Sequence, residues 1–410
     1  MLIRFCLPLV LLVSVSVKGQ FKNDNVLYKT VDPADLCATL ANNKGYILLD
    51  VRSKGEFYDT SSSPSYNLGH LKGAININAR ELGQRISEIR QYKDQPVFLY
   101  CSHSQRSRRA GKMLADSGFT NLFNINGGMT AIHYSDLKEK GCLKKLVETS
   151  VNYSIISAME LCGKMVQPKE PFILDVRSDS AFRHISTNAK ENAYGAFINT
   201  VNIPLAALAA RLSELPKNKE IIITDIYGDE ASQAAVLLKK NDFKDVSVLI
   251  EGIDRMVQMD GKKLLCKNGL YKSPVTYNLL STVEFGRLSK EKIGYLLLDV
   301  RSVEEFTNKH KDTWRNIGHL KGAVNVPADQ LEKTEILPGY ENIDKRTPVV
   351  IYSFGNSPEI FASAVTMQKK GYTNVQVLIG GIFNLRWTAG NVQGQSFLKE
   401  YVEDIPEINQ

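Results

Sequence analysis

Short apolar runs alternate with helical patterns along the chain. In the first third, apolar runs fall at residues 47–51, 74–77, 97–100 and 122–125. These runs are too short for helices and are rich in strand formers, so they predict buried strands. Apolar residues at helical spacing predict helices at 80–89 and 108–117. This alternation predicts a parallel sheet with helices on both faces, and sites in such sheets lie beyond the carboxyl ends of the strands.

Two sequence phrases recur along the chain. A phrase that contains Asp-Val-Arg-Ser covers residues 46–53, 172–178 and 295–302. The phrase Gly-His-Leu-Lys-Gly-Ala begins at Gly69 and again at Gly318, with the same offset from the aspartate, and a looser copy lies near Gly195. Because a period of about 125 residues is far too long for a solenoid unit, each copy is predicted to be a whole domain.

The repeats and the amino terminus divide the chain. We expect domains at 20–148, 149–270 and 271–402, followed by a tail at 403–410. We expect residues 1–19 to be a secretory signal peptide, because Arg4 precedes a short apolar run and small residues precede Gln20. The run is short for a membrane span, so we expect no stable membrane anchor after cleavage. The predicted location is the periplasm or the extracellular space, or the secretory lumen in a eukaryote.

The composition is that of an ordinary globular protein, with 43% hydrophobic and 23% charged residues among 410. The formal net charge of +7 falls to +5 when Arg4 and Lys18 leave with the signal peptide, and this mild excess does not favour a nucleic-acid partner. The sequence has no phosphate-binding glycine loop, zinc-ligand spacing or heptad pattern. We therefore expect neither a cofactor nor a bound metal.

One cysteine follows the third apolar run. Cys101 comes directly after the predicted strand at 97–100, and six residues separate it from the predicted helix that starts at Arg108. A turn from the carboxyl end of a strand into a helix points backbone N–H groups inward, which creates an anion site and favours a thiolate. Arg106, Arg108 and Arg109 add positive charge. The loop therefore predicts a nucleophilic sulfur beside an anion site, whereas the alternative is a buried, inert cysteine.

The two phrases and the cysteine loop together resemble the rhodanese (thiosulfate sulfurtransferase-like) family. The resemblance covers nearly all of the mature chain and implies three tandem rhodanese-like domains of α/β fold, each a parallel sheet flanked by helices on both faces. It implies that Cys101 accepts a sulfane sulfur from thiosulfate or a persulfide and passes it to a thiol or cyanide. Arg106 and the loop would hold the anionic donor. The other predicted substrate-binding residues are Ser102, His103, Ser104, Gln105 and Ser107.

Two features of this loop bear on its chemistry. Ser104 stands where the family often has glycine, and a serine is strained there if the backbone takes a positive φ. The number of residues between Cys101 and Arg106 is similar to that in the sulfurtransferase loop. The loop of the related dual-specificity phosphatases is one residue longer. The length therefore favours sulfur transfer, and a phosphatase or an arsenate reductase is the weaker alternative.

The other two repeats differ at the cysteine position. Asp225 replaces the cysteine in the second repeat, and Glu230 replaces Arg106. Carboxylates there would repel an anionic donor. A metal site formed by Asp225, Asp229 and Glu230 is an alternative, although a solvated acidic loop is the favoured interpretation. Ser353 replaces the cysteine in the third repeat, where no loop arginine follows. We expect both repeats to be non-catalytic and to serve as packing or binding partners of the first.

The remaining cysteines follow the repeats. The first two repeats each have one cysteine 13 residues before the aspartate of their first phrase and another after their last apolar run, whereas the third repeat has neither. This pattern predicts the disulfides Cys37–Cys142 and Cys162–Cys266, each worth about 4 to 5 kcal/mol in the chain-entropy model if unstrained. It leaves Cys101 as a free thiol. The sequence also leaves open a bond between Cys142 and Cys162 across the linker.

The sequence therefore favours an exported sulfurtransferase that works through a Cys101 persulfide in its first domain alone. The alternative from another class is a non-catalytic binding or scaffold protein in which Cys101 is a relic. Asn152 begins an N-glycosylation sequon, which has meaning only in a eukaryotic cell. The sequence determines neither the physiological donor and acceptor nor the oligomeric state.

Overall fold

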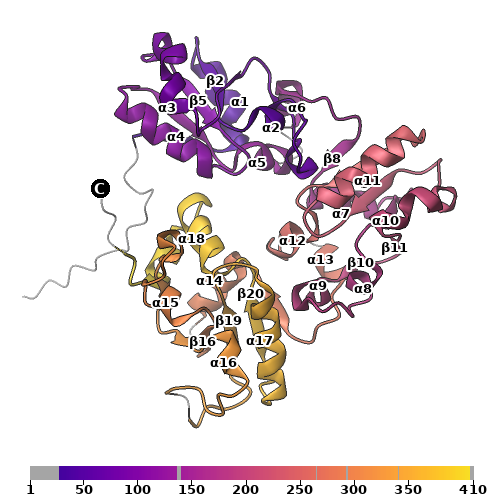
Figure 1. Cartoon of the computed structure of the whole chain (residues 1–410), viewed down its shortest axis with the longest axis vertical. Helices are drawn as coiled ribbons and strands as arrows, with labels where there is room; N and C mark the ends of the chain where they lie inside the picture. The colour runs from indigo at the N-terminus through magenta and orange to yellow at the C-terminus, as the bar shows by residue number, and fades with distance from the viewer. Residues whose placement is uncertain (1–26, 136–139, 265, 292–293, 340, 407–410) are drawn as a thin grey trace, which may run out of the picture.

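The computed structural model describes residues 27–135, 140–264, 266–291, 294–339 and 341–406, which form three units that follow one another along the chain (Figure 1). The predicted signal peptide at 1–19 lies outside the described residues. No helix in the described part of the chain has the length and hydropathy needed to cross a membrane.

Each unit is built on a five-stranded sheet in which all paired strands are parallel. In spatial order, the first sheet contains β1 (Lys29–Val31), β6 (Leu122–Ile125), β5 (Val97–Tyr100), β2 (Ile47–Asp50) and β4 (Ile75–Asn76). The second contains β8 (Ser154–Ile156), β13 (Val246–Leu249), β12 (Ile221–Thr224), β9 (Phe172–Asp175) and β11 (Val201–Asn202). The third contains β15 (Asn278–Leu280), β20 (Val375–Leu378), β19 (Val349–Tyr352), β16 (Leu296–Asp299) and β18 (Val324–Asn325).

Helices cover both faces of each sheet, which confirms the predicted fold class. The first unit has α1 (Pro33–Asn42), α2 (Lys54–Phe57), α3 (Leu82–Arg85), α4 (Gln105–Asp116), α5 (Gly128–Tyr134) and α6 (Lys140–Leu146). The second has α7 (Ala158–Met165), α8 (Asp179–Phe182), α9 (Ala189–Ala193), α10 (Leu205–Leu208), α11 (Asp229–Lys240), α12 (Gly252–Val257) and α13 (Cys266–Gly269). The third has α14 (Thr282–Lys290), α15 (Val303–Phe306), α16 (Ala328–Leu331), α17 (Pro358–Lys369) and α18 (Gly381–Asn391).

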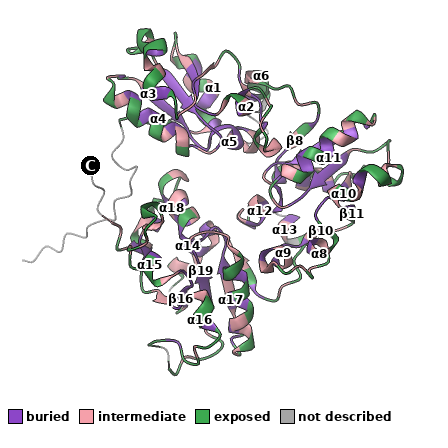
Figure 2. Ribbon diagram, in the orientation of Figure 1, coloured by how far each residue is buried: buried purple, intermediate pink, exposed green. Residues whose placement is uncertain are grey.

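The central strands are buried because side chains from both helical layers pack on them (Figure 2). In the first unit, α1, α5 and α6 share one apolar cluster with the sheet, while α3 and α4 share another on the opposite face. A third cluster is continuous from the second unit into the third, where Tyr194 packs edge-on against Phe361. The second and third units therefore pack against each other through a shared apolar core and are not joined by a linker alone.

The Asp-Val-Arg-Ser phrase has a structural role in all three units. Arg52 is fully buried, pairs with Asp50 at 2.7 Å and donates to the Gly69 carbonyl oxygen at 2.6 Å. Arg177 and Arg301 make the same contacts in their own units. This buried pair ties the end of a central strand to the Gly-His-Leu phrase, which explains why all repeats carry it while one repeat carries the cysteine.

Short antiparallel pairs close each unit and shift two predicted boundaries. The Gly-His-Leu phrase forms β3 (His70–Leu71), which pairs with β7 (Val147–Glu148). The equivalent pairs are β10 (Ala196–Phe197) with β14 (Tyr271–Lys272) and β17 (His319–Leu320) with β21 (Val402–Glu403). The second unit therefore extends past residue 270 to 272, and the third past 402 to 403. Strands of two residues carry no alternation in the sequence, so the pattern did not reveal them.

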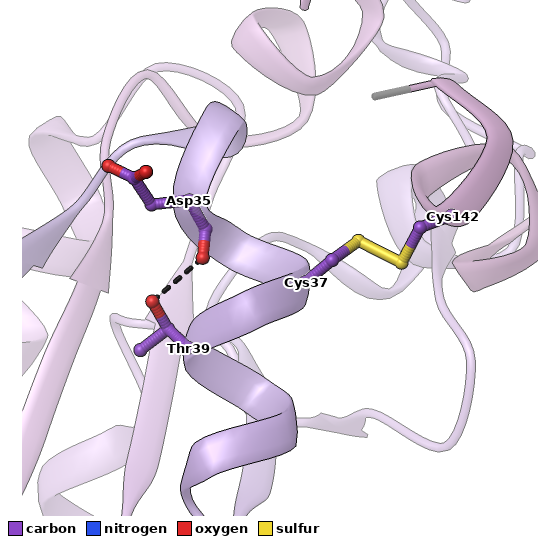
Figure 3. The surroundings of a disulfide bond; sticks show 4 residues. All are labelled: Asp35, Cys37, Thr39 and Cys142. Carbon is purple, nitrogen blue, oxygen red and sulfur yellow. Dashed lines mark hydrogen bonds between the residues drawn. A yellow bond between two sulfur atoms is a disulfide. The ribbon is translucent and has the colours of Figure 1, made fainter. Parts of the chain in front are cut away.

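Two disulfides fasten helices that flank the first two sheets. Cys37 of α1 is bonded to Cys142 of α6, with 6.5 Å between the Cα atoms (Figure 3). Cys162 of α7 is bonded to Cys266 of α13, with 5.4 Å between the Cα atoms. These are the pairs that the cysteine offsets favoured, and the structure does not contain the competing bond between Cys142 and Cys162.

Candidate active site at the Cys101 loop

Cys101 lies at the carboxyl end of β5, at the centre of the first sheet. Its thiol is not in a disulfide, and the residue is only 1% exposed. Its carbonyl oxygen accepts from the backbone N–H of Met129 at 2.9 Å, at the start of α5. Gly128 makes this close approach possible, because a Cβ atom there would lie 2.0 Å from the Cys101 oxygen. The loop is thus fixed between the starts of α4 and α5.

The turn into α4 occurs earlier than the sequence predicted. Ser104 has φ +74°, and α4 begins at the next residue, Gln105, instead of at Arg108. The strain that a serine carries in this conformation is offset by its hydroxyl, which donates to the Ile125 carbonyl at 3.1 Å and accepts from the Gly127 N–H at 2.6 Å. The serine that departs from the family pattern therefore joins the loop to the strand and turn behind it.

Arg106, the residue expected to hold the anionic donor, is paired with a carboxylate of its own domain. Its guanidinium makes two hydrogen bonds of 2.6 Å to the Glu56 carboxylate, and one of 2.9 Å to Ser102 Oγ. The bonds to Glu56 raise the pKa of Arg106, and the nearby Cys101 sulfur raises it further. Burial would raise the pKa of Glu56, but the bond from Arg106 holds it below the usual range. An anionic donor must therefore share Arg106 with Glu56.

Glu56 was not identified from the sequence as a site residue. It lies in α2, where its carboxylate also accepts from the backbone N–H of Ser53 and forms a capping box with that residue. The pattern of a serine followed by a glutamate three residues later predicts only a helix start. Its pairing with Arg106 across 50 residues depends on how α2 packs beside the loop.

His103 points out of the first unit toward the second. Its Nδ1 lies 2.9 Å from Ser102 Oγ, and its Nε2 lies 2.6 Å from Oε1 of Glu251 and 3.2 Å from Oγ1 of Thr130. Burial would raise the pKa of Glu251, but the hydrogen bond from His103 holds it low. Glu251 is a second site residue that sequence reasoning missed.

The other predicted loop residues differ in their relation to the sulfur. Ser107 is buried with its Oγ 3.8 Å from Cys101 Sγ, but its single hydroxyl hydrogen has a nearer acceptor in Asn124 Oδ1 at 2.6 Å. Gln105 and Arg109 are exposed. Burial lowers the pKa of Arg108, while the nearby Cys101 sulfur opposes that shift.

The equivalent loop of the second unit holds its own carboxylate. Asp225 follows β12 as Cys101 follows β5, and its side chain accepts from the backbone N–H groups of Gly228 and Ala231. These two amides occupy the loop positions of Ser104 and Ser107. Burial raises the pKa of Asp225 to about 6, although the two amides oppose the shift.

The three carboxylates of the acidic loop, Asp225, Asp229 and Glu230, have different surroundings. While Asp225 turns into its own loop, Asp229 accepts from the Ser65 N–H of the first unit at 3.1 Å. Burial and the charges of neighbouring carboxylates raise the pKa of Glu230. The described residues contain no group of three or more His, Cys, Asp or Glu side chains placed to hold a metal ion.

The loop of the third unit has yet another arrangement. Ser353 follows β19, and Pro358 occupies the position of Arg106 at the start of α17. The Asn356 side chain accepts from the Gly380 N–H and donates to the Tyr194 hydroxyl and the Asp254 carboxylate of the second unit, both at 3.3 Å. This loop is therefore used in packing between units.

The rhodanese-like domain model matches residues 33–134, 159–258 and 283–386, which together span well over half of the chain. The chain is 31% identical over 78 residues to thiosulfate sulfurtransferase GlpE of Shewanella oneidensis, a match that covers 19% of this chain and 75% of the relative. It is 43% identical over 81 residues to the uncharacterized protein YqhL of Bacillus subtilis, covering 20% of this chain but only 56% of that protein's length.

The crystal structure of a thiosulfate sulfurtransferase from Pseudomonas aeruginosa aligns over 86% of this chain and 66% of its own length, with 18% identity and a TM-score of 0.23. The domain matches and the GlpE match are the findings that identify the family, and two of the relatives, GlpE and PspE of Escherichia coli, are thiosulfate sulfurtransferases. The chain belongs to the rhodanese-like family and consists of three tandem rhodanese-like domains.

Proposed function

We propose that the first domain transfers sulfane sulfur through a persulfide on Cys101, while the second and third domains perform no chemistry of their own. The observation that carries the proposal is the Asp225 carboxylate, which receives the amides of Gly228 and Ala231 in the equivalent loop. In the first domain the amides of Ser104 and Ser107 hold the same loop positions around the Cys101 side chain. A negative charge on or beside that sulfur would take their hydrogen bonds.

The chemistry proceeds in two displacements. The Cys101 thiolate attacks the sulfane sulfur of thiosulfate, the bond between the two sulfur atoms of the donor breaks, and sulfite leaves with the electron pair. A thiolate or cyanide then attacks the outer sulfur of the persulfide. The bond between that sulfur and Cys101 breaks and restores the thiolate, and the product is a new persulfide or thiocyanate. Thiosulfate as donor is supported by the names of two relatives, GlpE and PspE of Escherichia coli.

Mass spectrometry of the full chain tests this proposal. Treatment with thiosulfate is expected to add one sulfur atom to Cys101, and cyanide is expected to remove it as thiocyanate. Cys101→Ser should abolish both steps, whereas Ser353→Ala should leave both unchanged because it alters the same loop position in the third domain. A wild-type chain that gains no sulfur from either thiosulfate or an inorganic polysulfide would overturn the proposal.

Export to an oxidising compartment is a further part of the proposal. It is supported by the disulfides Cys37–Cys142 and Cys162–Cys266, since disulfides rarely persist in a reducing cytosol. The unreduced protein from its native cell should have lost residues 1–19 and should contain one free thiol, at Cys101. A retained amino terminus with five additional free thiols, at Cys6 and at the four half-cystines, would contradict export.

A scaffold role is the second candidate, and the burial of Cys101 favours it. A sulfur that no donor can reach would leave the three domains as interaction surfaces only. The two roles differ in the reactivity of the native thiol. An accessible catalytic Cys101 should react with a small disulfide reagent in the folded chain, whereas a relic should react only after unfolding.

A further inference from the structure

The second domain places a carboxylate against the Cys101 loop of the first. Oε1 of Glu251 lies 2.6 Å from Nε2 of His103, 148 residues away in the sequence. Within its own domain, Glu251 lies farther from the Arg255 guanidinium, at 3.7 Å. Because a carboxylate can only accept, Nε2 of His103 carries the hydrogen in this contact. The stronger contact of Glu251 is thus the one across the domain boundary.

The backbone conformation at Glu251 indicates that a glutamate at this position does not serve the stability of the fold. Glu251 precedes α12 with φ +55°, and the equivalent residues before α5 and α18 are Gly127 and Gly380, with φ +70° and +82°. Glycine adopts this left-handed conformation without strain, whereas glutamate does not. The second domain therefore carries a strained residue where its sister domains carry the relaxed one, and strain of this kind collects at functional positions.

The contact continues through the loop to the arginine beside the sulfur. Nδ1 of His103 lies 2.9 Å from Ser102 Oγ, and in the tautomer that carries its hydrogen on Nε2 this nitrogen is an acceptor. The Ser102 hydroxyl then donates to His103 and accepts from Arg106, whose Nη2 lies 2.9 Å away. Donor and acceptor are thus matched at each of these three contacts. Glu251 is thereby linked, through His103 and Ser102, to the Arg106 guanidinium that Glu56 also binds.

We propose that Glu251 is a positioning residue of the first domain's sulfur-transfer site and acts through His103. The proposal rests on the proposed function and assigns the second domain a part in it. Helices α5 and α12 lie on sides of their units that face one another (Figure 1), and the Tyr134 hydroxyl of α5 donates to the Ile250 carbonyl at 2.9 Å. This second contact holds the residue before Glu251 against the first domain.

Replacing Glu251 by glycine separates positioning from folding. Glu251→Gly removes the carboxylate but restores the residue that the sister domains use, so the melting temperature should stay the same or rise. The second-order rate of Cys101 persulfide formation from thiosulfate should fall about tenfold, since small displacements of positioning groups cost this much or more. The loss should appear as a higher KM for thiosulfate, because Arg106 is misplaced. Glu251→Gln keeps the length and the acceptor oxygen and should stay within about threefold of the wild type.

A matched control lies elsewhere in the second domain. Asp242 is exposed and has φ +65°, and its equivalents in the sister domains are again glycines, Gly118 and Gly371. Asp242→Gly relieves the same kind of strain away from the loop and should leave the persulfide rate unchanged. An equal loss of rate in Asp242→Gly, or a wild-type rate in Glu251→Gly, would overturn the proposal.

A double-mutant cycle tests whether Glu251 acts through His103. His103→Ala should lower the rate by a factor similar to Glu251→Gly, and the double variant should be no slower than either single variant. Multiplicative losses would mean that the two residues act independently and would overturn the assigned route.

Failure of the proposed function can be told from failure of this inference. If the wild-type chain forms no persulfide, the proposed function is wrong, and the imidazole ¹⁵N resonances of His103 then decide the inference. The inference is supported if the hydrogen lies on Nε2 in the wild type but leaves Nε2, or is shared between Nε2 and Nδ1, in Glu251→Gly. Identical resonances in the two chains overturn it.

Discussion

The loops after β5 and β12 show what one strand-to-helix turn does with two different residues. Both turn through a residue with positive φ, Ser104 at +74° and Gly228 at +94°, and both open a twelve-residue helix at the next position. In the second domain the Asp225 carboxylate fills the loop and binds its amides. In the first domain the shorter Cys101 side chain leaves those amides for another negative charge. The comparison teaches that this turn presents amides to the first residue of the loop, which in the second domain is a carboxylate that accepts from them. Under the proposed function, the negative charge in the first domain is that of the Cys101 thiolate or of a substrate.

The two loops also differ in the charge at their sixth position. Arg106 of the first loop is balanced by Glu56, whereas burial and neighbouring carboxylates raise the pKa of Glu230 in the second. In this loop, the carboxylates of Asp225 and Glu230 would each repel an anionic donor. The second loop therefore has neither a thiol nor a cation at these two positions, and Glu251 is the carboxylate that the second domain places against the first domain's loop.

Reversing the charge of the sixth loop position should give the largest effect. Arg106→Glu copies the second loop into the first and places two carboxylates, Glu56 and the new one, beside the sulfur. The rate of persulfide formation from thiosulfate should fall about 100-fold, the usual loss on removing one donor that stabilises developing charge. Unpairing Glu56, whose side chain is 8% exposed, should also cost about 2 kcal/mol of stability.

The control for that variant is Arg109→Glu, which makes the same charge change on the exposed side of α4. Rapid-quench mass spectrometry measures the rate, and thermal unfolding measures the stability. A similar loss in both variants would show that the net charge of the domain, and not the position of Arg106, controls the reaction.

The carboxylate in the second loop should make that domain lose stability as the pH rises. The pKa of Asp225 is raised to about 6 in the folded chain, against about 3.9 when unfolded. Between these values the folded state binds more protons than the unfolded state, so its stability is greatest below about pH 4 and falls until about pH 6. Each pKa unit is worth about 1.4 kcal/mol, which gives a fall of about 2 to 3 kcal/mol.

Hydrogen exchange of the β12 amides, corrected for the intrinsic rate at each pH, measures this fall in the second domain. Asp225→Asn should remove most of the dependence on pH over this window, and what remains should come from Glu230, whose pKa is also raised. Amides of β5 in the first domain, where Cys101 replaces the aspartate, serve as the internal reference. A fall of the same size in both strands would assign it to other groups.

The smallest effect should come from exchanging the residues at the turn. Ser104→Gly relieves the positive φ but removes the hydroxyl that binds Ile125 and Gly127, so we expect a net loss of about 1 kcal/mol. Gly228→Ala should cost about the same for a different reason, because the added Cβ has ordinary contacts at 3.4 Å or more and only the φ is strained. Denaturant unfolding measures both, and a stabilised Ser104→Gly would show that the strain outweighs the hydroxyl bonds.

Much of the fold was predictable because its signals are local. The four-residue apolar runs, the recurring phrases and the cysteine offsets are properties of short segments, and parallel sheets constrain how such segments combine. The lengths of helices and the two-residue strands were not predictable to the residue. The start of α4 depends on the φ of Ser104, and β7 forms only because the Gly-His-Leu phrase lies beside it.

The sequence by itself determined which repeat holds a thiol, which repeats hold Asp225 and Ser353 in its place, and that Cys101 would be left over when the other cysteines pair. Only the tertiary structure decided what surrounds that thiol. Glu56 reaches Arg106 across 50 residues, and Glu251 reaches His103 across 148. The sequence gives the residue type at each position. The contacts of a side chain depend on how helices and whole domains pack, because packing brings together residues that no local pattern connects.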